Sequence, residues 1–110
     1  ITALNGKLEW KKAGPVNASS SLTIPSNARE VIISVAIADS AGDRVFQSVF
    51  LRAQLTGTKV LFIGGYYYSS SDYGLVNVDL TNGSAVKIRN SVYFANDRKS
   101  VSTLTIWYNI

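Results

Sequence analysis

The sequence predicts an all-β fold, an antiparallel β-sandwich of about eight strands in a jelly-roll-like arrangement. Apolar and polar residues alternate with a period of two along most of the chain, as they do in strands with one buried face. Turn residues interrupt the alternation about every ten residues, and no segment has the apolar spacing of a long helix. A chain of 110 residues is expected to form a single domain over residues 1–110.

The N-terminal quarter has the least regular pattern, and only short strands are expected there. Lys7–Lys12 alternates like a strand that Ala13–Pro15 should end, because proline cannot donate a backbone hydrogen bond. Ser19–Ile24 predicts a second short strand that stops at Pro25. A short helical turn fits the following segment, Pro25–Arg29.

A long strand at Arg29–Ala38 is expected to supply much of the core. Its odd positions carry larger side chains than its even positions, so the odd face should point inward. The expected core residues of this strand are Val31, Ile33, Val35 and Ile37. The polar segment Asp39–Asp43 follows as a turn.

The next strand, expected at Arg44–Leu55, carries apolar residues on both faces. The face expected to be buried carries Val45, Gln47, Val49, Leu51, Ala53 and Leu55. The opposite face mixes Phe46 and Phe50 with two arginines. That mixture suits a surface that is partly covered by a partner.

Alternation continues through the C-terminal half, where five further extended segments are expected. They are Lys59–Tyr68, Gly74–Leu80, Ala85–Asn90, Ser91–Ala95 and Val101–Ile110. Asn82–Gly83 is a strong hairpin signal, and Gly64–Gly65 inside a strand pattern indicates a bulge or a close backbone approach. Trp10 and Trp107 lie on strand-like patterns near the termini and are expected to help close the sandwich.

The composition argues against catalysis, and no catalytic residue is expected. The chain has no histidine and no cysteine, which removes the usual base of a Ser–His pair and all thiol chemistry. Its seven acidic residues lie mostly in predicted turns, and no spacing singles out a carboxylate pair for hydrolysis. Asp39 and Asp43 offer oxygen ligands for calcium, but a hairpin turn with two capping acids is the favoured interpretation. No cofactor and no metal are therefore expected.

Positive charge is dispersed along the chain, which has eleven lysines and arginines against seven acids and a net charge of +4. The only adjacent pairs are Lys11–Lys12 and Arg98–Lys99, so no basic stripe predicts nucleic-acid binding. The apolar runs Val31–Ala38 and Val60–Ile63 are too short to span a bilayer, and no membrane insertion is expected. Because the chain begins at Ile1, we expect it to be the C-terminal piece of a longer chain.

The segment Gly64–Tyr73, which reads GGYYYSSSDY, is the candidate binding site, because it holds four of the six tyrosines. Tyrosine offers a rigid apolar plate and a hydroxyl group at little entropic cost. The residues expected to contact ligand are Tyr67, Tyr68 and Tyr73 by stacking, and Ser70 and Asp72 by hydrogen bonding.

Strand alternation divides this segment into two parts. Gly64–Tyr68 is expected to end a strand, with Tyr66 packed inward and Tyr67 facing the other way. Ser69–Tyr73 is expected to form the exposed connection to the next strand. The alternatives are that these tyrosines cap the core or lie between subunits.

Three stretches of the chain carry a resemblance to a known family. They are LTIPSNAREV at Leu22–Val31, GYYYSSS at Gly65–Ser71 and STLTIWY at Ser102–Tyr108. In this order they resemble C-terminal domains of tail fibres and minor tail proteins of tailed bacteriophages and prophages. The resemblance implies a small β-sandwich at a fibre tip, assembled as a homotrimer, that binds a host-surface glycan or protein. It also implies a location in the virion, outside the bacterial cell, and transfers no residue roles.

Two other functions fit the same pattern. The domain is either a structural one that trimerises and locks the end of a fibre, or a carbohydrate-binding module of a larger bacterial protein. A trimer would explain the low proportion of charged residues, 16%, because subunit contacts would cover semi-apolar faces. A carbohydrate-binding module of a larger protein is expected to be monomeric.

Overall fold

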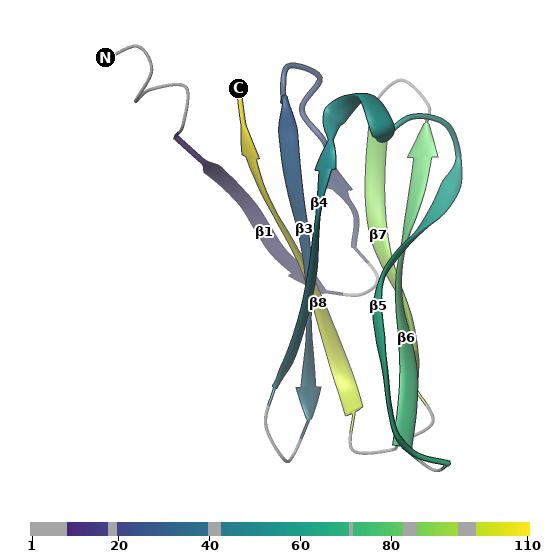
Figure 1. Ribbon diagram of the computed structural model, residues 1–110. Helices are drawn as coiled ribbons and strands as arrows, with labels where there is room; N and C mark the ends of the chain where they lie inside the picture. Colours follow the sequence, from purple (N-terminus) through teal and green to yellow (C-terminus); the bar gives the residue numbers. More distant parts are fainter. Residues whose placement is uncertain (1–8, 18–19, 40–42, 71, 83–85, 95–98) are drawn as a thin grey trace.

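The structure, a computed structural model, describes residues 9–17, 20–39, 43–70, 72–82, 86–94 and 99–110. The strands in these residues are β1 (Lys11–Asn17), β2 (Leu22–Thr23), β3 (Glu30–Asp39), β4 (Arg44–Leu51), β5 (Lys59–Ser69), β6 (Asp72–Asn82), β7 (Val86–Phe94) and β8 (Lys99–Asn109). They form two antiparallel four-stranded sheets, which face each other in Figure 1. Sheet A has the order β1-β8-β3-β4, and sheet B has the order β2-β7-β6-β5. The predicted all-β sandwich of about eight strands is confirmed.

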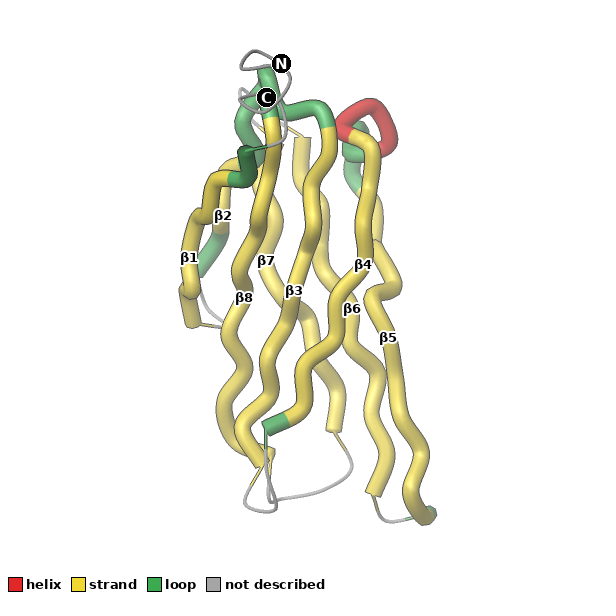
Figure 2. The backbone as a smooth tube through the Cα atoms, turned by 60° about the vertical axis from the view of Figure 1, so that its left-hand side comes forward, coloured by secondary structure: helices red, strands yellow, loops and turns green. Residues whose placement is uncertain are grey.

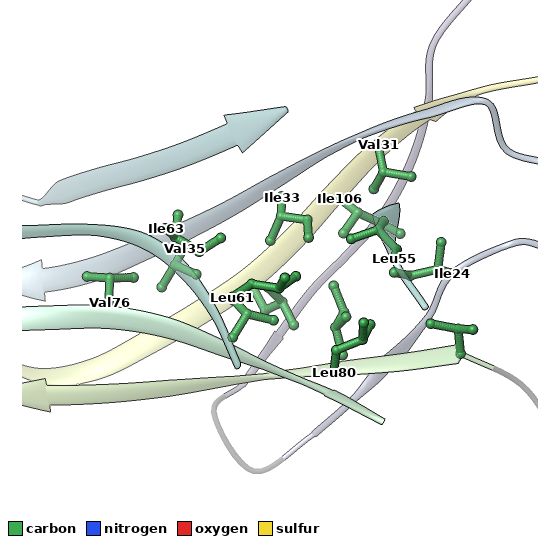
Figure 3. Close-up of a cluster of buried hydrophobic side chains, with 14 of the residues drawn as sticks. Ile24, Val31, Ile33, Val35, Leu55, Leu61, Ile63, Val76, Leu80 and Ile106 are labelled. Carbon is green, nitrogen blue, oxygen red and sulfur yellow. The ribbon is translucent and has the colours of Figure 1, made fainter. Parts of the chain in front are cut away.

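The core lies between the inner faces of the two sheets, where aliphatic side chains from both meet (Figure 3). The largest fully buried side chains are Ile24, Ile33, Ile37, Leu55, Leu80, Ile88, Leu104, Ile106, Val31, Val35, Val76 and Val78. Burying one such side chain stabilises the fold by about 1.5–3 kcal/mol relative to leaving it in water. The predicted inward face of Arg29–Ala38 is therefore confirmed.

Pairings between distant segments close the sandwich at one edge. β1 pairs with β8 and β2 pairs with β7, whereas β3–β4 and β5–β6–β7 pair with their neighbours in the chain. At the opposite edge β4 and β5 lie side by side in Figure 2, and Ser48 Oγ donates a hydrogen bond to the Ile63 carbonyl oxygen at 3.3 Å. The hairpin β5–β6 is thereby fixed beside sheet A at this open edge.

The first strand differs from its prediction, because β1 continues through Gly14 and Pro15 where a break was expected. The register against β8 shifts between Ala13 and Val16, which absorbs the proline in an edge strand. Gly14 has a φ of +94°, and an added Cβ would lie 2.7 Å from the Leu104 carbonyl oxygen. Only glycine fits at such a position.

Helical structure also falls at a different place from the one expected. Pro25–Arg29 forms a turn, in which the Ala28 amide donates to the Pro25 carbonyl oxygen. A single 3-10 turn instead covers Arg52–Gln54, where the sequence predicted a continuing strand. The Arg52 guanidinium donates to the Pro25 and Leu55 carbonyl oxygens and so holds this turn in place. In the described part of the chain, no helix has the length and hydrophobicity needed to cross a membrane.

The two faces of β4 are the reverse of the prediction. Val45, Val49 and Leu51 are exposed by 62%, 60% and 56%, while Phe46 and Phe50 pack against the core. The register with β3 explains the reversal, because Phe46 and Phe50 lie directly opposite two fully buried valines of β3. Residues that face each other across a ladder point to the same side of the sheet.

Candidate functional site

The hairpin β5–β6 carries the candidate site on the outer face of sheet B. β5 runs to Ser69 and β6 begins at Asp72, so Tyr67 and Tyr73 are strand residues that pair directly across the ladder. The connection predicted over Ser69–Tyr73 is shorter in the structure, because the pairing between β5 and β6 extends to Ser69 and Asp72. The two tyrosines are therefore held by backbone hydrogen bonds and not by a loop.

Tyr67 and Tyr73 form an exposed ring pair. Their ring centroids are 6.1 Å apart with an interplanar angle of 28°, a geometry that adds favourable aromatic contact. The side chain of Tyr67 is 74% exposed, and Tyr73 is half-buried beside it. Ser70 is exposed at the turn. The side chains of Tyr68 and Asp72 lie outside what the structure describes, so their roles stay predictions.

The neighbouring Tyr66 points the opposite way from Tyr67, as the alternation predicted, and it packs, as expected. Its ring stacks on Phe46 of β4 with centroids 6.3 Å apart, and the Arg44 guanidinium carbon lies 4.8 Å from its centroid. A cation at this distance over an aromatic face is favourable. Tyr66 thus ties the hairpin to sheet A while Tyr67 faces solvent.

A β-bulge in β5 decides which tyrosine faces outward. Phe62 pairs with Asn77 and Gly64 pairs with Val76, so β5 gains one residue between these pairs. Strict alternation from Phe62 would have placed Tyr67 in the core. An added Cβ on Gly64 would lie 2.8 Å from Phe46 Cδ1, so glycine lets β5 approach β4 closely. The bulge that Gly64–Gly65 predicted is confirmed.

The exposed tyrosines lie next to further exposed apolar side chains, which were not among the predicted site residues. Phe62 is 63% exposed and Leu75 is 49% exposed on the same face. Gly65 lies between them, where an added Cβ would be 3.6 Å from Phe62 Cζ and 3.4 Å from Leu75 Cδ2. Phe62, Leu75, Tyr67 and Tyr73 are called the aromatic strip below. No sequence signal marked Phe62, because Val60–Ile63 is apolar at every position.

The outer face of sheet A carries a second exposed apolar surface. Trp10, Ile32, Gln47 and Trp107 line a shallow groove of about 280 Å³ there. Lys12 Nζ lies 5.8 Å from the Trp107 ring centroid. Trp107 is half-buried and Trp10 is 40% exposed, so both tryptophans lie on this outer face and neither joins the core between the sheets.

The described residues hold no cluster of metal-binding side chains, since no group of three or more acidic, histidine or cysteine side chains lies together among them. Most of the turn Asp39–Asp43, considered above for calcium, falls outside the described residues. The fold and the strip define an antiparallel β-sandwich with an exposed aromatic surface. Comparison of the chain with protein-family models, curated proteins and solved structures found no match.

Proposed function

We propose that this chain is a non-catalytic carbohydrate-binding domain that uses the aromatic strip. The observation that carries the proposal is the stacked pair of Tyr67 and Tyr73, because Tyr67 leaves 74% of its side chain in water. A tyrosine that only capped the core would bury most of its ring. An exposed ring on a paired strand offers a sugar a flat apolar surface that needs no reordering on binding.

The residues next to Tyr67 and Tyr73 lengthen the apolar surface along the strands, which suits a ligand made of several sugar units. Phe62 and Leu75 close over the bare backbone of Gly65 and continue the apolar area along β5 and β6. Asn77 lies directly across from Phe62 and offers an amide to ligand hydroxyl groups. Exposed apolar area flanked by polar groups is typical of recognition surfaces.

The biological setting of the proposal comes from the tail-fibre resemblance. We infer a tip domain of a phage tail fibre or minor tail protein that attaches to a host-surface glycan or protein from outside the cell. A homotrimer suits this role, since three copies of a weak site bind a repetitive surface far more strongly than one. The net charge of +4 favours approach to anionic envelope polymers.

A second candidate function, a structural domain that locks a fibre end, is favoured by the outer face of sheet A. Val45, Val49 and Leu51 are exposed there beside the tryptophan groove. Sheet A has four strands that lie about 4.8 Å apart and are about eight residues long, so its outer face has an area of roughly 500 Å². That area approaches the roughly 800 Å² that each partner contributes to a standard interface. Under this second candidate only, a copy of this chain covers the outer face of sheet A.

One variant separates the two candidates, with two readouts on the same sample. Tyr73→Ala is expected to lower the affinity for arrayed bacterial surface glycans by about tenfold, because the ring pair is broken. Light scattering is expected to give the same oligomer mass for the variant and the parent chain. Retained binding with a smaller oligomer would support the structural candidate instead. A monomeric parent chain would favour a carbohydrate-binding module of a larger protein.

A further inference from the structure

A polar pocket lies on the same outer face as the aromatic strip, farther along β6. Its volume is about 310 Å³, and its lining residues are Ser21, Asp79, Thr81, Lys87, Ile88 and Arg89. The pocket lies beside β2, which is only two residues long. Leu22 and Thr23 pair with Ile88 and Lys87, and among the described strands β7 has no neighbour on that side from Arg89 onward.

The pocket combines two cations with one carboxylate and hydroxyl groups. Lys87 and Arg89 are exposed on the outward positions of β7. Arg89 lies directly across from Asp79 on β6, and Lys87 lies across from Thr81, whose Oγ1 donates to the Lys87 carbonyl oxygen at 3.5 Å. The pocket therefore carries a net positive charge. An arginine fork beside a lysine suits the two oxygens of a carboxylate or a phosphate.

The aromatic strip and this pocket lie on one strand at a fixed separation. Tyr73 and Asp79 both lie on β6 with outward neighbours across the ladder. Six residues along a strand correspond to roughly 20 Å. A ligand that contacts both must be an extended chain, and a single sugar cannot reach from one to the other.

We propose that the pocket binds an anionic group, carboxylate or phosphate, of the same carbohydrate chain that stacks on the aromatic strip. This inference rests on the proposed function and narrows the ligand to an acidic polysaccharide. Stacking of sugar rings supplies contact area at Tyr67 and Tyr73, and the charged subsite near Arg89 selects for acidic chains. A neutral chain makes no ionic contact with Lys87 and Arg89 and is therefore expected to bind more weakly.

The test is titration calorimetry with three defined polymers. They are polygalacturonate, which supplies carboxylates, phosphorylated dextran, which supplies phosphates on sugar rings, and fully methyl-esterified polygalacturonate, which is the neutral match of the first. The parent chain is expected to bind at least one anionic polymer and to bind the neutral one at least tenfold more weakly. The affinity should fall as salt rises from about 0.1 M to about 1 M.

Arg89→Gln is expected to weaken binding of the anionic polymer by about tenfold or more. Lys11→Gln is the matched control, because it removes one exposed charge from β1 in the other sheet. Unchanged melting temperatures exclude misfolding as the cause. Binding of neither anionic polymer, or equal affinities for the two variants, would overturn the inference.

Tyr67→Ala, measured in the same titrations, separates this inference from the proposed function. Weakening by Tyr67→Ala without weakening by Arg89→Gln would leave the strip as a binding site and reject the charged subsite. Weakening by Arg89→Gln alone would reject the strip and, with it, the claim that both sites hold one chain.

Discussion

Replacing both Tyr67 and Tyr73 with alanine is expected to weaken carbohydrate binding by at least about 30-fold, with little change in melting temperature. The two rings stack on each other at 6.1 Å on the outer face of β5 and β6. Their removal takes away the flat apolar area at the turn end of the proposed surface. An aromatic contact contributes about 0.5–1.5 kcal/mol beyond its buried area, so the loss of two such contacts corresponds to about 30-fold in affinity.

The expected stability of the double variant follows from the exposure of the rings. Tyr67 is mostly in water in the free chain, so its loss opens no cavity in the core. Val45→Ala with Val49→Ala is the matched control, because these side chains are similarly exposed on the outer face of sheet A. Equal loss of binding in the control pair would contradict the assignment of the site to sheet B.

Ile106→Ala is expected to lower the free energy of unfolding by about 2–5 kcal/mol, a large part of the stability of a domain of this size. Ile106 of β8 is fully buried between the sheets. Truncation to alanine removes three carbon atoms and leaves a cavity that paired strands on both sides cannot close. Urea denaturation measures the loss, and the dependence on urea concentration should stay the same if the fold is intact.

The control for this substitution lies four residues farther along the same chain segment. Ile110→Ala makes the same chemical change at a side chain that is 42% exposed. Its expected effect is below about 1 kcal/mol, because exposed substitutions leave no cavity. Similar losses for the two variants would mean that the two sheets do not enclose the core described above.

The fold was largely predictable because alternation alone identifies strands with one buried face. Val31, Ile33, Val35 and Ile37 were all placed inward correctly. The same rule failed for β4, where both faces are apolar and alternation has no preferred side. There the register against β3 decides, and register is a property of two strands, not of one.

Long-range pairing was the part of the fold that local pattern could not supply. Asn109 Nδ2 donates to Glu30 Oε1 at 3.0 Å, although the residues are 79 positions apart. Nothing in either sequence neighbourhood indicates the other. The register shift that carries β1 past Pro15 likewise depends on β8 as its partner.

The candidate site was half predictable. Composition singled out Gly64–Tyr73, and alternation correctly placed Tyr66 and Tyr67 on opposite faces. The bulge at Gly64 decides that Tyr66 is the one that packs. Phe62 and Leu75 join the strip only through the ladder between β5 and β6, so their shared face became evident from the register. The pairing of Arg89 with Asp79 likewise became evident only from the register between β6 and β7.

The central claim is that the outer face of sheet B, and not that of sheet A, contacts the ligand. The chain has no cysteine, so Leu75→Cys and Val49→Cys each create a single site for a bulky thiol-reactive label. Both parent side chains are exposed, one on each outer face. The label at position 75 is expected to abolish binding to the glycan that the unlabelled chain recognises, and the label at position 49 to leave it intact. Blocking by the label at position 49 with retained binding at position 75 would contradict the claim.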